Sequence, residues 1–328
     1  MDISILYTIF PRRKQKIEIS VRIDFARGLC YNIFKKFAGE NSMRKPEWLR
    51  RVYSQEDIDE INLLMKDLKL NTVCREASCP NIGECYRKHT ATFLVMGANC
   101  TRRCRFCNVS KLPPTPLDPE EPENVAAACR QMGLRHAVIT SVTRDDLPDG
   151  GAAHFAAIVR ALRGAGIPTI ELLIPDLRGN EEALVVILKE EPDILGHNVE
   201  TRPEIYAEVR PQANYERSLR ILAATKEIDP GRLTKTGIMV GLGETEEQLL
   251  AVFDDLAEVG CDILTIGQYL QPSKLHLEVK EFVTPERFER LGELAKRAGI
   301  RYTFSAPLVR SSYRAAEALE ALGSETRK

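Results

Sequence analysis

Six of the nine cysteines lie in the short stretch from Cys74 to Cys107. They form two groups of three. The first triplet has intervals of four and five residues and consists of Cys74, Cys79 and Cys85. The second has intervals of three and two residues and consists of Cys100, Cys104 and Cys107. Three thiolates at short spacing can hold three irons of a 4Fe-4S cluster, because a short loop points successive sulfurs at different corners of one cube. The sequence therefore predicts two separate ligand sets, each leaving one iron for another donor.

Zinc binding and disulfide bonding are the two other common uses of clustered cysteines. A structural zinc site prefers four ligands in C-x2-C pairs or in mixtures of cysteine and histidine, and the nearest histidine, His89, lacks such a partner. A disulfide framework is disfavoured because the cysteine count is odd, the chain is long and no export signal is evident. Both alternatives are weaker than iron-sulfur ligation.

The second triplet, C-x3-C-x2-C with Phe106 just before its last cysteine, resembles the signature of the radical S-adenosylmethionine (SAM) superfamily. In that superfamily, the amino and carboxylate groups of SAM chelate the open iron. Joined to the preceding C-x4-C-x5-C, the pattern resembles the lipoyl synthase family, in which the first triplet carries an auxiliary 4Fe-4S cluster. The likeness runs from about Met43 to the C-terminus.

The resemblance also implies further site residues. A serine of the C-terminal R-S-S-Y motif would supply the fourth ligand of the auxiliary cluster. Spacing alone leaves Ser311 and Ser312 equivalent, and matching the family's motif selects Ser312. The SAM contacts that the resemblance implies are Phe106, Asn198, Glu200 and Gly241. Without the resemblance, we would interpret Phe106 as a core aromatic residue, Gly241 as a turn residue and the two serines as part of a polar tail.

The chemistry that the resemblance implies is radical sulfur insertion. A reduced cluster splits SAM, and the 5'-deoxyadenosyl radical removes hydrogen from unactivated carbons, which no side-chain acid or base can do at neutral pH. In the family, carbons 6 and 8 of an octanoyl chain each gain a sulfur from the auxiliary cluster. That chain is carried on a lysine of a lipoyl domain of a 2-oxoacid dehydrogenase or of the glycine-cleavage H protein.

Further partners follow from the same chemistry. The resemblance implies a low-potential electron donor, such as ferredoxin or flavodoxin, and an iron-sulfur carrier that replenishes the consumed cluster. Two other classes of protein compete with this interpretation. One is a different radical SAM enzyme with an auxiliary cluster, which the upstream triplet and the terminal R-S-S-Y disfavour. The other is a non-enzymatic iron-sulfur carrier, which needs neither an open iron nor a substrate-sized barrel.

Strand and helix patterns alternate from Thr92 onward and predict an α/β fold. We expect strands at 92–96, 137–142, 169–174, 193–199, 236–240, 263–269 and 301–304. We expect helices at 123–132, 152–162, 181–189, 215–226, 245–259 and 285–298. Repeated βα units favour a partial or full (β/α) barrel of the radical SAM type, with N- and C-terminal extensions covering the auxiliary cluster. A doubly wound open sheet is the alternative. Parallel strands end on one face, and the second triplet directly follows the first of them.

The predicted organisation has four parts. Residues 1–42 form a basic extension outside the core. Residues 43–90 hold a helix that begins at Ser54, followed by the first triplet, which Pro80 and Gly83 place in a loop. Residues 91–305 form the barrel, and residues 306–328 form the tail with the R-S-S-Y motif.

Composition narrows the class and location of the protein. The 46 Lys and Arg residues nearly balance the 47 Asp and Glu residues, which argues against nucleic-acid binding. No apolar run reaches membrane-spanning length, and the abundant thiols fit a reducing, cytoplasmic setting. Residues 1–42 contain eight basic and four acidic residues. They fit either a tail upstream of a true start at Met43 or an organellar transit peptide.

Overall fold

The computed structural model describes residues 3–4, 20–21, 45–51, 55–312, 317 and 321. Contacts divide the chain into two units, residues 1–44 and 45–328. In the first unit, β1 (Ile3–Ser4) pairs with β2 (Ser20–Val21) in an antiparallel sheet. The second unit contains both cysteine triplets and begins with η1 (Glu47–Leu49) and α1 (Gln55–Asp67). The helix start predicted at Ser54 lies outside the described residues.

An eight-stranded sheet forms the centre of the second unit. Its strands are β3 (Asn71–Thr72), β4 (Thr92–Val95), β5 (His136–Ser141), β6 (Thr169–Leu173), β7 (Ile194–Gly196), β8 (Leu233–Val240), β9 (Ile263–Gln268) and β10 (Tyr302–Ser305). Neighbours in sequence are neighbours in the sheet, and every pair from β4 to β10 is parallel, whereas β3 is antiparallel to β4. Among the described strands, β3 and β10 form the two ends of the order. The sheet is therefore a partial barrel, which confirms the predicted fold class.

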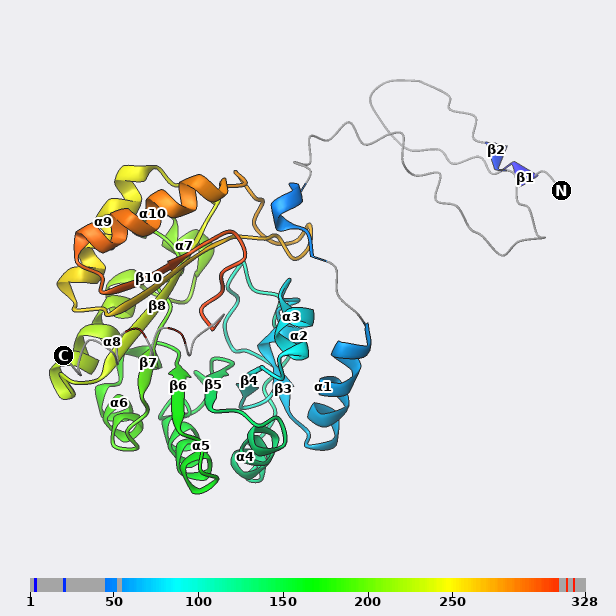
Figure 1. Ribbon diagram of the computed structural model, residues 1–328, viewed down its shortest axis with the longest axis vertical. Coiled ribbons are helices and arrows are strands. Elements are labelled where there is room, and N and C mark those ends of the chain that lie inside the picture. Colours follow the sequence, from blue (N-terminus) through cyan, green and yellow to red (C-terminus); the bar gives the residue numbers. More distant parts are fainter. Residues whose placement is uncertain are drawn as a thin grey trace. The chain divides into compact units, whose positions relative to one another are not determined.

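The connecting helices cover the outer side of the curved sheet (Figure 1). They are α4 (Glu121–Gln131), α5 (Ala152–Gly164), α6 (Glu181–Leu188), α8 (Tyr215–Ile228), α9 (Glu246–Glu258) and α10 (Pro285–Ala298). Side-chain caps fix several starts: Thr245 and Gln248 form a reciprocal capping box on α9, and Asn180 and Asn214 cap α6 and α8. None of the described helices is long and apolar enough to cross a membrane.

Alternation along the strands separates a packed outer layer from the barrel interior. Ile139, Leu172 and Leu195 are fully buried in the layer between sheet and helices. The residues next to them in sequence face the opposite side. There, Lys235 of β8 donates to both carboxylate oxygens of Glu171 of β6, at 2.8 and 2.9 Å. The interior thus contains a paired buried charge rather than an open channel at this level.

The first triplet departs from its predicted loop. Cys74 lies in the short helix α2 (Val73–Glu76), and Cys85 lies in α3 (Ile82–Arg87). Only Cys79 occupies the turn between them. The prediction was wrong because two local hydrogen bonds support helical turns: Thr72 Oγ1 accepts the N–H of Arg75, and the Asn81 carbonyl accepts that of Cys85. Four other short helices of the described residues were not predicted, namely η1, η2 (Leu177–Gly179), η3 (Pro203–Ile205) and α7 (Tyr206–Val209).

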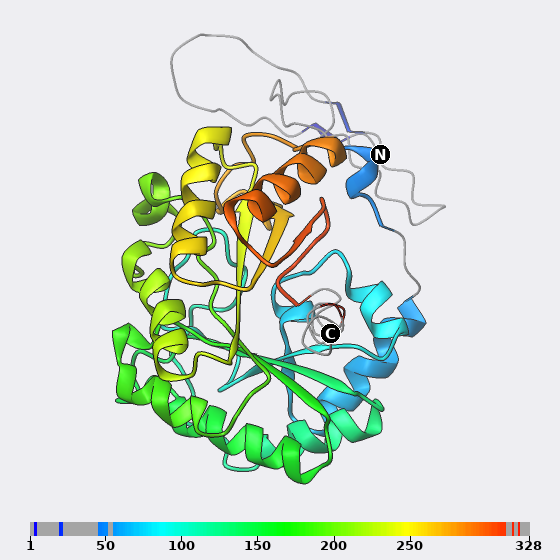
Figure 2. The same cartoon turned by 60° about the vertical axis from the view of Figure 1, so that its left-hand side comes forward.

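The segment after β10 turns back toward the beginning of the sheet (Figure 2). Its first part lies along β9, where the N–H of Gln268 donates to the carbonyl of Pro307 at 3.2 Å. Gly267 allows this approach, because a Cβ there would lie 2.1 Å from the carbonyl oxygen of Val309. Its last described part reaches β4, where Thr92 Oγ1 donates to Ser312 Oγ at 2.7 Å. Arg310, Ser311 and Ser312 are thereby brought toward β4, at the beginning of the parallel sheet.

Candidate functional site

The second triplet follows β4 at the carboxyl end of the sheet, as predicted. Cys100 Sγ accepts the backbone N–H of Thr143, at 3.3 Å, and that of Arg102, at 3.5 Å. Burial raises the pKa of the Cys104 and Cys107 thiols. The nearby Cys100 thiol raises the pKa of both further, and Cys104 adds to the shift of Cys107, whereas the ammonium group of Lys111 acts in the opposite direction on both.

The thiols of the first triplet form a second such group. Burial raises the pKa of Cys74 and Cys85 to about 12, and the nearby Cys79 thiol adds to both shifts. Burial also raises the pKa of Cys79, where the guanidinium of Arg310 acts in the opposite direction. Because Arg310 belongs to the R-S-S-Y motif, the structure brings this motif to the first triplet.

The two groups of buried thiols are suited to bind iron-sulfur clusters. Buried thiols resist ionisation, and bound metal reverses that resistance because a coordinating thiol is deprotonated outright. All eight described cysteines are free of disulfides. Among the described residues, no three His, Cys, Asp or Glu side chains gather around a point where one metal ion could bind. A cubane distributes its ligands over separate corners, so the donor type and grouping are those that it needs.

A buried guanidinium anchors the loop of the second triplet. Arg102, between Cys100 and Cys104, is 2% exposed and donates to Asp145 at 2.7 and 2.9 Å and to Asp176 at 2.5 Å. Asp176 also accepts from Arg217 of α8 at 2.8 Å. The loop is thereby attached to the segments after β5 and β6. The sequence analysis missed Arg102, although an arginine between two ligands of a buried loop is a usable signal.

Asn198 and Glu200, two predicted SAM contacts, lie beside the second triplet at the end of β7. Burial raises the pKa of Glu200, and the guanidinium of Arg210 opposes this shift. Arg210 Nη1 donates to the Asn198 carbonyl at 2.8 Å, and Arg210 and Glu200 both act on the pKa of Cys104. Among the described residues, Asn198 Oδ1 and Arg210 Nε are buried without a hydrogen-bond partner. Nothing in the sequence around Arg210, which follows α7, pointed to this position.

The two serines of the R-S-S-Y motif have different neighbours. Ser311 Oγ accepts from Asn198 Nδ2 at 3.3 Å, on the side of the second triplet. Ser312 Oγ accepts from Thr92 Oγ1 at 2.7 Å, and the backbone N–H of Thr92 donates to the Cys74 thiol. Adjacent Cα atoms are about 3.8 Å apart. One dipeptide therefore lies between the surroundings of the two thiol groups.

Two other predicted SAM contacts, Gly241 and Phe106, have structural roles that account for their type. Gly241 has φ +102°, and a Cβ there would lie 2.1 Å from Gln268 Nε2. Its N–H donates to Glu244 Oε2 at 2.9 Å, so this loop is held by its own side chain. Phe106 packs in an apolar cluster with Val209 and Tyr269.

Other polar residues near the strand ends are committed to the fold. His197 is 1% exposed and bonds to the carbonyl of Ile174 and to Ser218, both at 2.9 Å. Arg144 pairs with Asp146 at 2.8 Å and donates to the carbonyl of Met96.

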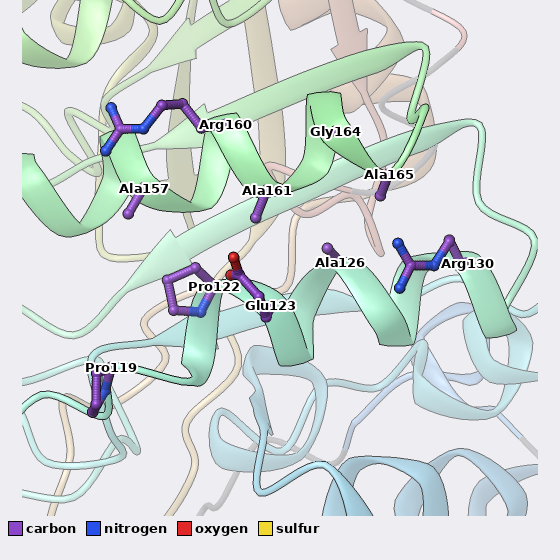
Figure 3. Close-up of a pocket in the computed structure, with 10 residues that line it drawn as sticks. All are labelled: Pro119, Pro122, Glu123, Ala126, Arg130, Ala157, Arg160, Ala161, Gly164 and Ala165. Atoms are coloured by element: carbon purple, nitrogen blue, oxygen red, sulfur yellow. The ribbon is translucent and has the colours of Figure 1, made fainter.

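A cavity of about 580 Å³ lies between α4 and α5 (Figure 3). Small residues such as Ala126, Ala161 and Gly164 line it, with Arg130 and Arg160 among the charged ones. It contains none of the predicted site residues and lies on the helical layer outside the sheet. Its small side chains reflect the close packing of α4 against α5 rather than a site for the chemistry of the cysteines.

The fold and the site together define a radical SAM enzyme. The family model described as the radical SAM superfamily matches residues 94–256. The crystal structure of Streptococcus suis SuiB bound to precursor peptide SuiA has a TM-score of 0.50 at 12% identity, covering 64% of this chain and 47% of that chain. At such low identity this similarity shows the fold alone.

Curated relatives give the particular family. The lipoyl synthase of Caldanaerobacter subterraneus subsp. tengcongensis is 54% identical over 274 residues, which cover 84% of this chain and 96% of that protein. The lipoyl synthase of Geobacter sulfurreducens is 53% identical over 277 residues, covering 84% and 91%. The chain belongs to the lipoyl synthase family and is a radical SAM sulfurtransferase.

Proposed function

We propose that two 4Fe-4S clusters in one cavity of this chain insert sulfur at carbons 6 and 8 of an octanoyl chain. The second triplet would hold the SAM-binding cluster, and the first triplet with Ser312 would hold the auxiliary cluster. The observation that carries the proposal is the position of the R-S-S-Y motif: Ser311 contacts Asn198 and Ser312 contacts Thr92, one on each side of the space between the thiol groups.

When bound, the clusters and SAM supply a carbon radical and the sulfur that quenches it. The chain's own residues must position these reagents and the substrate. The site must also exclude water and stray reductant, because either would consume a radical before it reaches the octanoyl chain. Lys235 and Glu171 neutralise each other's charge in the barrel interior.

Asn198, Glu200 and Arg210 are suited to bind SAM. The carboxylate of Glu200 can accept from a ligand amine or hydroxyl, and Arg210 can pair with a ligand carboxylate. The unpartnered Asn198 Oδ1 and Arg210 Nε are available for such contacts. Phe106 offers an aromatic face for adenine. The Gly241 loop would border the ligand, although its N–H is already bonded to Glu244.

Ser312 suits the fourth ligand better than Ser311. Its hydroxyl shares Thr92 as a neighbour with Cys74. An alkoxide is a harder ligand than a thiolate and holds iron less durably. Such a ligand fits an iron that must leave when its cluster gives up sulfur.

The substrate in this proposal is an octanoylated lipoyl domain of a 2-oxoacid dehydrogenase or the glycine-cleavage H protein. A ferredoxin or flavodoxin would supply electrons, and an iron-sulfur carrier would rebuild the auxiliary cluster. The reaction would take place in the reducing cytoplasm, where thiols persist without forming disulfides. Residues 98–117, which include the second triplet, contain no acidic residue and carry Arg103, Arg105 and Lys111. This charge favours an acidic donor.

Single-cysteine variants test the division of labour. With SAM, reductant and an octanoyl-lysine peptide, Cys100→Ala should release no 5'-deoxyadenosine yet retain the iron of the first triplet. Cys79→Ala should still release 5'-deoxyadenosine but yield no lipoyl product. Cys129→Ala, a buried cysteine on α4, is the matched control and should behave as the unaltered protein. Lipoyl product from Cys79→Ala would exclude the auxiliary cluster as the sulfur donor.

A further inference from the structure

We propose that Asn81 is the positioning residue that docks the serine-bearing C-terminal segment onto the first triplet before any iron is bound. The inference rests on the proposed role of Ser312 as a ligand. Asn81 lies in the turn between Cys79 and Cys85 and binds iron in neither ligand set proposed above.

The side chain of Asn81 bridges two distant parts of the sequence. Its Nδ2 donates to the carbonyl of Leu308 at 2.7 Å, across 227 residues. Asn81 is 2% exposed and Leu308 is 5% exposed, so water does not compete for this bond. A buried carbonyl that loses its donor costs more free energy than an exposed one, because no solvent replaces the bond.

The backbone of Asn81 holds two of the three thiol ligands. Its N–H lies close enough to the Cys79 thiol to lower the pKa of that thiol. Its carbonyl accepts the N–H of Cys85 at 2.9 Å. One residue therefore connects Cys79, Cys85 and the C-terminal segment, and its position fixes all three relative to one another.

The Asn81 bond lies between the part of the segment that is fixed to β9 and the part that carries the serines. Pro307 and Ala306 bond to Gln268 and Ile266 and so fix the segment to β9. Beyond them, Asn81 contacts the carbonyl of Leu308, four positions before Ser312, and Asn198 contacts Ser311. Thr92 then donates to Ser312 at 2.7 Å. These contacts join the segment to β9, to the first triplet and to β4 through protein atoms.

An amide is the side chain that this position requires. The Nδ2 group faces a carbonyl, and only a donor satisfies it. Among the described residues, Asn81 Oδ1 is buried without a partner. An aspartate of the same shape would place a carboxylate oxygen against the Leu308 carbonyl with no proton between them. Asn81→Asp should therefore release the segment while changing little else in shape.

The first test uses full-length, iron-free protein and trypsin. Cleavage after Arg310 requires the segment to leave the barrel, because the preceding Val309 is 1% exposed. We expect Asn81→Asp to be cut there about tenfold faster, the effect of losing a buried hydrogen bond together with desolvation of an unpaired group. Asn180→Asp is the matched control, because Asn180 acts only as an acceptor, from the N–H of Ala183, and aspartate keeps that role. Equal rates for Asn81→Asp and the unaltered protein would overturn the docking role.

The second test uses reconstituted protein and Mössbauer and electron paramagnetic resonance spectra. Asn81→Asp should lose the fourth iron of the auxiliary cluster and show a three-iron signal, with the cluster of the second triplet unchanged. Faster cleavage combined with an intact four-iron spectrum would overturn the link between docking and ligation. Asn81→Ser, which is neutral and too short to reach Leu308, should reproduce both effects if aspartate prevents folding.

Ser312→Ala separates failure of this inference from failure of the proposed function. It should lose the fourth iron while its iron-free form is cut by trypsin at the normal rate. If Ser312→Ala keeps a four-iron auxiliary cluster, the ligand assignment fails. The trypsin comparison of Asn81→Asp still decides whether Asn81 docks the segment.

Discussion

His197 is held as a neutral ring by its surroundings. Its Nδ1 faces the carbonyl of Ile174, which can only accept, and its Nε2 faces the hydroxyl of Ser218. Burial lowers the pKa of His197 from 6.5 to about 4, and the guanidinium of Arg210 acts in the same direction. The ring therefore resists protonation in the folded chain but accepts a proton readily in the unfolded one.

A pH dependence of stability follows from this shift. Above about pH 6.5 the ring is neutral in both states and has no effect. Between about pH 6.5 and pH 4 only the unfolded chain takes up the proton, so stability falls as the pH falls. From about pH 7.5 to pH 5, His197→Gln should lose about 2 kcal/mol less free energy of unfolding than the unaltered protein. Urea unfolding at both pH values measures this, with exposed His89→Gln as control, and parallel losses in all three proteins would refute the assignment.

Single residues also show which parts of the site can be predicted from the sequence and which cannot. Six cysteines were predictable because their spacing alone carries the chemistry of cluster ligation. Ser311 and Ser312 were not separable, because adjacent residues have the same spacing to any ligand, and only contacts to Asn198 and Thr92 distinguish them. Arg210 left no pattern, since its role depends on where α7 ends.

At the scale of elements, the second-triplet loop depends on a buried ion-pair network. Asp176 has a fully buried side chain that accepts from Arg102 and Arg217. These hydrogen bonds and charges hold the pKa of Asp176 well below its usual range despite the opposing effect of burial. Removing one partner of such a network leaves an uncompensated buried charge.

Asp176→Ala should lower the free energy of unfolding by about 3 kcal/mol, because it leaves the buried Arg102 and part-buried Arg217 without this partner. Urea denaturation of the iron-free protein measures the loss. Glu227→Ala is the control: Glu227 also pairs with an arginine, Arg220, but the two side chains are 59% and 43% exposed, and exposed pairs contribute little to stability. Equal losses of free energy of unfolding in the two variants would show that the buried Arg102 network stabilises the fold no more than an exposed ion pair does.

The parallel strands were predictable and the short helices were not. Apolar runs such as those of β4 and β5 mark strands buried on both faces, and caps such as Thr245 mark helix starts. The sequence did not predict helices α2 and α3, because segments of so few residues show no clear hydrophobic periodicity. Hydrogen bonds formed in the folded chain decide their conformation. The return of the C-terminal segment depends on Asn81 and Gly267, contacts far apart in sequence.

At the scale of the whole molecule, charge and exposed apolar groups gather around the second-triplet loop. Leu112 is 67% exposed and Leu275 is 93% exposed. His276, next to Leu275, contacts the carbonyl of Cys107 at 3.2 Å. Exposed Arg103 and Lys274 lie in the same two segments. Small apolar contacts within a charged surface suit a transient electron-transfer partner.

Charge reversal tests whether an acidic electron donor docks on this surface. Arg103→Glu combined with Lys274→Glu should reduce SAM cleavage driven by flavodoxin at least about tenfold at low salt, with the difference shrinking as salt screens the charges. Dithionite needs no docking, so cleavage driven by it should remain normal. Reversal of exposed Lys296 on α10 is the control. An equal loss with both reductants would exclude a docking role.

The central claim is that the two triplets hold two separate clusters. Iron and sulfide analysis with Mössbauer spectroscopy on anaerobically purified protein tests it most directly. We expect about eight irons per chain in two 4Fe-4S populations, and about four when the first triplet is replaced by alanines. About four irons in the unaltered protein, or loss of all iron from the alanine variant, would contradict the account.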